Sequence, residues 1–192
     1  MSEADSDEMD VRRAVVLDYL AHGLSEGRRR FQQSPAGYAL NTADFTLYQV
    51  AFDEDARITI GTNVVVEPPE ERDVIEDCRP VGYDDLSSGA QSELEYVVHD
   101  LVEENEERFV DFYNDAQPIT LRLHQLNLLP GIGKKLRNTI LDERKRKPFE
   151  SFEELEDRVS GLHDPGDVLA NRILEELRDE DLKYRTFVGQ EP

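Results

Sequence analysis

Residues 126–136 read LNLLPGIGKKL, and this stretch decides the fold of the C-terminal half of the chain. An apolar run that we expect to be helical enters a Pro-Gly-Ile-Gly turn, and a second helix leaves it with Leu136 and Ile140 on one face. Glycines on both sides of Ile132 allow the backbone to turn tightly and to approach another molecule closely. The pattern therefore predicts two helices joined by a hairpin at residues 129–134.

The start of the outgoing helix carries an electrostatic conflict. Gly133, Lys134 and Lys135 stand where the amide N–H groups of a helix lack intrahelical partners. The helix dipole favours an anion at this end and opposes a cation by about 0.3–1 kcal/mol. A phosphate bound between the two lysines would remove the conflict. The alternative is that Pro-Gly-Ile-Gly is only a tight turn between two packed helices.

This stretch resembles the helix-hairpin-helix motif of nucleic-acid-binding proteins, whose hairpin reads Leu-Pro-Gly-Ile-Gly followed by small or basic residues. The resemblance covers residues 123–141. It implies that the amides of Gly131, Gly133 and Lys134 hold a phosphate of one strand while Lys134 and Lys135 add charge. In some members of the superfamily the hairpin carbonyls also bind a monovalent cation. Here those carbonyls would belong to Asn127, Leu129 and Ile132.

Basic residues gather around this hairpin in a chain that is otherwise strongly acidic. The 192 residues carry a formal net charge of −21, yet residues 122–147 hold eight bases and two acids, or +6. Such an island is typical of a nucleic-acid-binding surface. The candidate nucleic-acid-binding residues are Gly131, Ile132, Gly133, Lys134, Lys135, Arg137, Arg144, Lys145, Arg146 and Lys147 from this segment, with Arg28, Arg29 and Arg30 from an earlier loop.

The choice of basic residue is also informative. Five lysines stand against 17 arginines, and 43 residues are acidic. This composition suits a cytoplasm kept at molar salt, where the Debye length is ~3 Å and self-repulsion is screened. We therefore expect a halophilic, cytoplasmic protein. The alternative is an ordinary acidic protein with a well-solvated surface.

Several classes of protein are excluded by what the sequence lacks. No apolar run reaches the ~20 residues of a membrane helix, and residues 1–10 are acidic without the apolar core of a signal peptide. Cys78, the single cysteine, excludes a disulfide framework and a cysteine-based zinc site. The four histidines form no metal-ligating spacing, and no Walker A motif occurs. We expect no cofactor, no membrane partner and no enzymatic activity.

The hydrophobic pattern predicts an α+β fold with two lobes. Residues 1–10 are read as a disordered acidic tail, residues 11–84 as a small β-barrel and residues 85–192 as a helical domain. Short strands with tight turns favour an OB-like barrel, with an SH3-like barrel as the alternative. The expected strands are residues 14–20, 45–52, 56–60, 63–66 and 74–81, and residues 22–36 are read as a loop.

The helical domain is expected to begin with an amphipathic helix, capped by Ser87 or Ser88, and a second helix that ends near Pro118. A degenerate second hairpin follows at about residues 151–178, with acids where phosphate binding needs neutral or basic residues, so we interpret it as structural. The last segment, residues 183–188, has a strand-like pattern.

The barrel offers a second candidate surface. Arg28, Arg29 and Arg30 precede Phe31 in a loop, the combination of charge and aromatic ring that binds single strands. The alternative is that these arginines pair with neighbouring carboxylates. Most of the lobe's aromatic residues, Phe45, Tyr48 and Phe52 among them, are expected in the core.

The order of acidic tail, small barrel, hairpin lobe and closing segment KYRTFV (residues 183–188) resembles the archaeal family called domain of unknown function 655. That resemblance covers about residues 11–190 and implies an OB-like domain joined to a helix-hairpin-helix lobe. It implies binding of nucleic acid, with RNA favoured over DNA. Phosphate contacts at the hairpin would make this binding largely independent of sequence. The alternative is an interaction module that docks its acidic helices on a ribosomal or transcription protein, with a purely structural hairpin. The sequence leaves the oligomeric state open.

Overall fold

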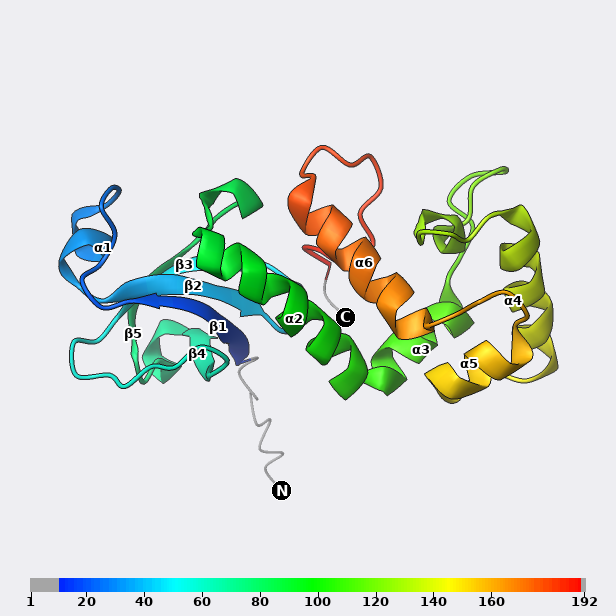
Figure 1. The fold of residues 1–192 in the computed structure, drawn as a ribbon, viewed down its shortest axis with the longest axis horizontal. Coiled ribbons are helices and arrows are strands. Elements are labelled where there is room, and N and C mark those ends of the chain that lie inside the picture. Colours follow the sequence, from blue (N-terminus) through cyan, green and yellow to red (C-terminus); the bar gives the residue numbers. More distant parts are fainter. Residues whose placement is uncertain (1–10, 191–192) are drawn as a thin grey trace, which may run out of the picture. The chain divides into compact units, whose positions relative to one another are not determined.

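An antiparallel sheet of five strands dominates residues 11–94, the first of two units in the computed structural model, which describes residues 11–190 (Figure 1). The strands are β1 (Arg12–Leu20), β2 (Ala36–Asn41), β3 (Leu47–Phe52), β4 (Asn63–Glu67) and β5 (Ile75–Pro80). They lie in the order β4-β1-β2-β3-β5, and edge strands β4 and β5 touch without a hydrogen-bonded ladder. The expected small barrel is therefore a curled half-barrel. The predicted tail, residues 1–10, lies outside the described residues.

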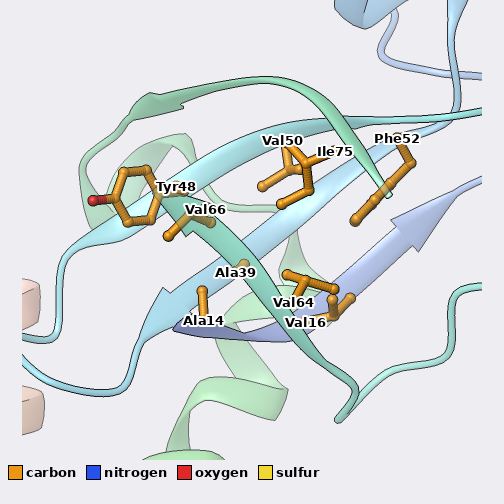
Figure 2. Packing of buried hydrophobic residues seen from close by; sticks show 9 residues of the cluster. All are labelled: Ala14, Val16, Ala39, Tyr48, Val50, Phe52, Val64, Val66 and Ile75. Atoms are coloured by element: carbon orange, nitrogen blue, oxygen red, sulfur yellow. The ribbon is translucent and has the colours of Figure 1, made fainter. Parts of the chain in front are cut away.

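The sheet exists because alternate residues of its strands are apolar and meet on one face. Figure 2 shows this cluster, in which every labelled side chain is buried. Its members are Ala14, Val16, Ala39, Tyr48, Val50, Phe52, Val64, Val66 and Ile75. Phe45 is buried as well, so the expectation that these aromatic residues serve the core is confirmed.

Strand β2 and the short helix α1 (Arg29–Gln33) were not expected from the sequence. Residues 36–41 are rich in alanine and glycine, which have weak β propensity, so their pattern gives no strand signal. Small residues are needed there because the neighbouring strand is very close: a Cβ on Gly37 would lie 2.0 Å from the carbonyl oxygen of Asp18. Helix α1 buries Phe31 completely, so the prediction that this ring stacks on a base is wrong.

The predicted strand at residues 56–60 is also wrong. This segment lies in the connection between β3 and β4, where side chains and amides close turns instead of a ladder. The carboxylate of Asp53 accepts from the amide of Asp55 at 3.1 Å, and the hydroxyls of Thr59 and Thr62 lie 2.9 Å apart. Ile60 remains half exposed as a result.

The second unit, residues 95–190, is helical. Its elements are the later part of α2 (Ser88–Glu104), then α3 (Glu106–Asp115), η3 (Gln125–Leu128), α4 (Lys134–Arg146), α5 (Phe152–Arg158) and α6 (Pro165–Arg178). The division falls at Leu94, inside α2, whereas the sequence analysis placed it after residue 84. The first turns of α2 belong with the sheet because Ser87 caps the helix through the amide of Ala90 and donates to the carboxylate of Asp18.

The strand expected at residues 183–188 does not form, because a buried carboxylate binds its amides. Glu176 is fully buried and accepts from the amides of Thr186, Phe187 and Val188 at 2.8–3.0 Å. Arg172 donates its Nε to the same carboxylate at 3.0 Å. The segment is therefore held on α6 as an irregular chain instead of pairing with a strand.

Candidate nucleic-acid interface

The bend at residues 129–134 forms where the sequence placed it, although the helix that enters it is a single 3-10 turn, η3, instead of the expected α-helix. Leu129 and Ile132 are buried and fix the bend to the body of the unit, and the amide of Ile132 donates to the carbonyl of Leu129 at 3.2 Å. Pro130 and Gly131 between them are exposed. The two buried side chains thus hold the bend against the unit, while its exposed residues remain accessible to a ligand.

Both glycines of the bend face empty space. Gly131 has φ of +79°, a backbone conformation that other residues rarely adopt, so the turn itself requires glycine there. Gly133 has φ of −86°, which any residue can adopt. A Cβ built on either glycine meets no atom within 4 Å. Internal packing and backbone strain therefore do not explain Gly133, and the space beside it is free for a ligand.

The first turn of α4 presents the predicted phosphate-binding groups. Gly133 is the N-cap without a side chain to satisfy the turn, and no acidic residue lies in that turn. Within residues 11–190, the amides of Gly131, Gly133 and Lys134 donate to no acceptor of the protein. Lys134 and Lys135 are exposed, and no carboxylate of the described chain lies within ion-pair distance of their ammonium groups. No side chain of residues 11–190 therefore relieves the predicted electrostatic conflict at this helix end.

Beside this turn lies a hollow of about 540 Å³. Its lining residues are Leu121, Arg122, Leu123, Asn127, Lys134 and Arg137. Three of the six are cations and none is acidic. The hollow therefore combines positive charge with apolar surface next to the open bend.

Asn127 holds the parts of this site together. Its Nδ2 donates to the carbonyl of Ile132 at 3.2 Å, and its Oδ1 accepts from Nη1 of Arg137 at 3.0 Å. The expected cation-binding carbonyls are thus partly engaged, since those of Ile132 and Leu129 each accept a hydrogen bond from the protein. The same asparagine fixes the guanidinium of Arg137 at the edge of the hollow.

The loop that carries Leu121 and Arg122 is a structural feature that the sequence analysis did not identify as part of the site. The amides of Ile119 and Thr120 donate to the carbonyl of Leu123 at 2.8 and 3.0 Å, and the hydroxyl of Thr120 accepts from the amide of Leu123 at 3.0 Å. Such bonds make the loop a defined turn with Leu121 at its tip. The sequence gives little indication of this loop, because Leu121 lies in a stretch of alternating apolar and polar residues that is also typical of a strand.

The basic island divides into two parts with different roles. At the far end of α4, Nη1 of Arg144 donates to the carbonyls of Tyr113 and Ala116, which end α3, at 3.1 and 3.0 Å. Arg146 pairs with Glu143, and Lys147 lies 3.2 Å from Glu150. Arg144 is thus engaged by main-chain carbonyls, whereas the ion-paired side chains of Arg146 and Lys147 remain exposed. Lys145 is exposed.

Arg158 is a further cation that the sequence analysis did not single out. Its Nη2 donates to the carbonyls of Glu143 and Lys147 at 2.6 and 2.7 Å, and its guanidinium lies 4.5 Å from the centre of the Phe149 ring. It caps the C-terminal end of α4, a role that depends on tertiary contacts. Arg144 and Arg158 together fix α4 to α3 and α5.

The remaining candidates lie elsewhere. Arg28, Arg29 and Arg30 are exposed at the start of α1, in the first unit. A loop joins α5 to α6 where the sequence analysis placed the degenerate second hairpin. This loop carries exposed Asp164, and just after it lies Asp167, whose carboxylate is 3.0 Å from His99. This second loop is acidic where the first is basic.

Two ionisable groups behind the bend are perturbed by their surroundings. Burial lowers the pKa of His124, and the nearby cations of Arg144 and Arg137 lower it further. Its Nδ1 accepts from the amide of Leu126 at 3.1 Å, so the neutral ring is the form that caps η3. Burial also lowers the pKa of Arg144, while Asp115 opposes that shift.

No metal-binding cluster of three or more His, Cys, Asp or Glu residues occurs in the part of the chain that the structure describes. No helix within residues 11–190 has the length and apolar character needed to cross a bilayer. The structure thus defines a class: a two-unit α+β protein with a cation-lined bend between η3 and α4.

Comparison with known proteins assigns the family. The model of a protein family of unknown function, DUF655, matches residues 10–189. The chain is 37% identical over 176 residues to the uncharacterized protein MJ0038 of Methanocaldococcus jannaschii, covering 91% of this chain and 78% of that one. The crystal structure of Af1531 from Archaeoglobus fulgidus, a DUF655 protein, is similar with a TM-score of 0.82 and 35% identity, over 93% of this chain and 99% of that one. The chain belongs to the DUF655 family, as its resemblance to that archaeal family indicated.

Proposed function

We propose that this chain is a non-enzymatic nucleic-acid-binding protein that holds a phosphate of the strand at the bend of residues 129–134. The observation that supports this most directly is the open first turn of α4. It joins unpaired amides, empty space beside Gly133 and two lysines whose charge nothing in the described protein neutralises. A phosphate is the ligand that satisfies all three at once.

This mode of binding is largely independent of sequence, because contacts to phosphates position a strand without reading its bases. It also suits the high salt that we propose for the cell of origin. Binding by lysine charge alone weakens steeply with salt. The slope of the logarithm of the binding constant against the logarithm of the salt concentration, the salt slope, is near −0.9 per neutralised phosphate on duplex DNA. Hydrogen bonds from amides already fixed in place depend less on ion release. RNA is favoured over DNA on the family resemblance described in the sequence analysis.

The half-barrel supplies a secondary, OB-like surface in this proposal. Its buried aromatic residues leave no stacking platform among Phe31, Tyr38, Phe45, Tyr48 and Phe52. The exposed arginines at residues 28–30 would instead contact the backbone of the strand by charge.

Reversing both lysine charges tests the function. Lys134→Glu with Lys135→Glu places acids at a helix N-terminus, which favours the fold by about 0.3–1 kcal/mol each, so a loss of binding cannot be attributed to unfolding. We expect retention on immobilised RNA to be abolished at matched salt, with a salt slope lower by about 1 per lysine. Anisotropy titrations on RNA and DNA strands measure both quantities.

Lys145→Glu is the matched control. Lys145 is exposed on the same helix, and its reversal changes the net charge in the same direction at the opposite end. We expect it to weaken binding much less than reversal at the bend. Unchanged retention of the double variant would exclude the hairpin as the binding site. A protein partner that survives nuclease treatment and the double reversal would support the interaction-module alternative.

A further inference from the structure

Leu121 is the most exposed large apolar side chain in the described part of the chain, with a relative exposure of 107%. It is held there by a defined turn, because the Thr120 hydroxyl and the Leu123 carbonyl bind the amides of the loop. A leucine in such a position gains nothing from the fold, since its side chain contacts water instead of a core. Its placement at the rim of the hollow beside the bend leaves this apolar surface available to a ligand in the hollow.

The chemistry of the hollow limits what that partner is. Leu121 and Leu123 contribute apolar surface, and Arg122, Lys134 and Arg137 contribute three positive charges. The ligand therefore carries negative charge and a flat or apolar part within one small molecule's length. A nucleotide has both, in its phosphate and its base.

We propose that the hollow holds one unpaired nucleotide, with its base against Leu121 and its phosphate against Arg122 and Lys134. This deepens the proposed function by naming the substrate class, single-stranded nucleic acid, and it rests on that function. The volume of about 540 Å³ lies within the roughly 300–1,000 Å³ of small-molecule pockets, which is enough for one nucleotide. In a duplex the faces of the bases are stacked on each other, whereas an unpaired base exposes its face to a side chain.

The absence of tryptophan from the sequence makes a direct test simple. Leu121→Trp introduces the single tryptophan of the chain at the tip of the loop. We expect its fluorescence to be quenched when single-stranded RNA or DNA is added, because the indole ring stacks on a base. Tyr96→Trp is the control, since Tyr96 is exposed on α2 outside the lining of the hollow, and it should show no quenching.

Two further variants separate the base contact from the phosphate contact. Leu121→Ala removes apolar surface only, so we expect about threefold to tenfold weaker binding of single strands with an unchanged salt slope. Arg122→Gln removes one charge, so the salt slope should fall by about 0.7. Both residues are exposed, and unfolding midpoints of the variants should equal that of the parent.

Each outcome decides between the two proposals. If the double reversal at Lys134 and Lys135 abolishes binding while Leu121→Trp is not quenched and Leu121→Ala binds normally, the nucleotide pocket is wrong and the phosphate site stands. Equal affinity for a duplex and a single strand would also overturn the pocket. If the double reversal leaves binding unchanged, the proposed function itself fails.

Discussion

A single carboxylate, that of Glu176, shows how one residue redirects a segment of the chain. The pattern of residues 183–188 favours a strand, because alternating apolar residues normally join a sheet. The buried side chain of Glu176 instead accepts three of the amides that a ladder would have used. No sequence rule shows that a glutamate ten or so positions earlier will be fully buried, so this part of the structure could not be predicted.

At the same scale, His124 should make the stability of the protein depend on pH. The pKa of His124 is lowered in the folded protein, so as the pH falls below its ordinary value of about 6.5 the unfolded chain binds a proton that the folded chain does not. The free energy of unfolding should therefore decrease from about pH 7 downward until the folded ring is also protonated. Urea unfolding of the parent and of His124→Asn, which keeps a capping oxygen that does not titrate, measures this contribution.

His124→Asn should flatten the slope of stability against pH in this range relative to the parent. An identical slope in the parent and in His124→Asn would show that the buried ring does not contribute.

At the scale of the element, the start of α4 predicts a conflict between stability and binding. Gly133→Ser adds a preferred N-cap whose hydroxyl accepts from the amides of the first turn, so the fold should gain a few tenths of a kcal/mol. The same hydroxyl occupies the space and the amides that a phosphate would use, and we expect about tenfold weaker binding of RNA. Thermal unfolding and anisotropy titration on the same preparation measure the two effects.

Gly131→Ser is the companion variant. Its side chain also points into open space, but the φ of +79° makes any side chain strained, at a cost of about 1–2 kcal/mol. It should therefore lower both stability and affinity, while Gly133→Ser lowers affinity alone. A Gly133→Ser variant that binds as tightly as the parent would show that no ligand uses the first turn.

Elements that depend on local sequence could be predicted, whereas those that depend on tertiary contacts could not. The long amphipathic helices and the hairpin at residues 129–134 follow from local periodicity and from Pro-Gly-Ile-Gly, both of which are visible in the sequence. Strand β2 was missed because its alanine and glycine residues are selected by the close approach of β1 at Asp18, a tertiary contact. The hollow was missed for the same reason, since it joins the turn at Leu121 to residues of α4 through Asn127.

At the scale of the whole molecule, the net charge of −21 should make stability rise with salt. The Debye length falls from about 10 Å at 0.1 M to about 3 Å at 1 M ionic strength, so the mutual repulsion of exposed carboxylates is screened over this range. We expect the thermal midpoint to increase with KCl and then level off. Substituting the exposed Glu103, Glu104 and Glu107 by glutamine should reduce the increase, and a midpoint that falls with KCl would contradict the halophilic interpretation.

The contacts of Arg144 and Arg158 have a consequence for any alanine scan of the basic island. Both guanidinium groups donate to main-chain carbonyls near the C-terminal end of α4. Lys134 and Lys135, at its N-terminal end, are exposed to solvent. Truncating Arg144 or Arg158 would lower the apparent affinity by loosening the packing of α4 against its neighbours. Truncating Lys134 or Lys135 would lower it by removing a contact to the nucleic acid. The two losses look alike on a gel, and they are distinguished when each variant's unfolding curve is recorded beside its binding curve.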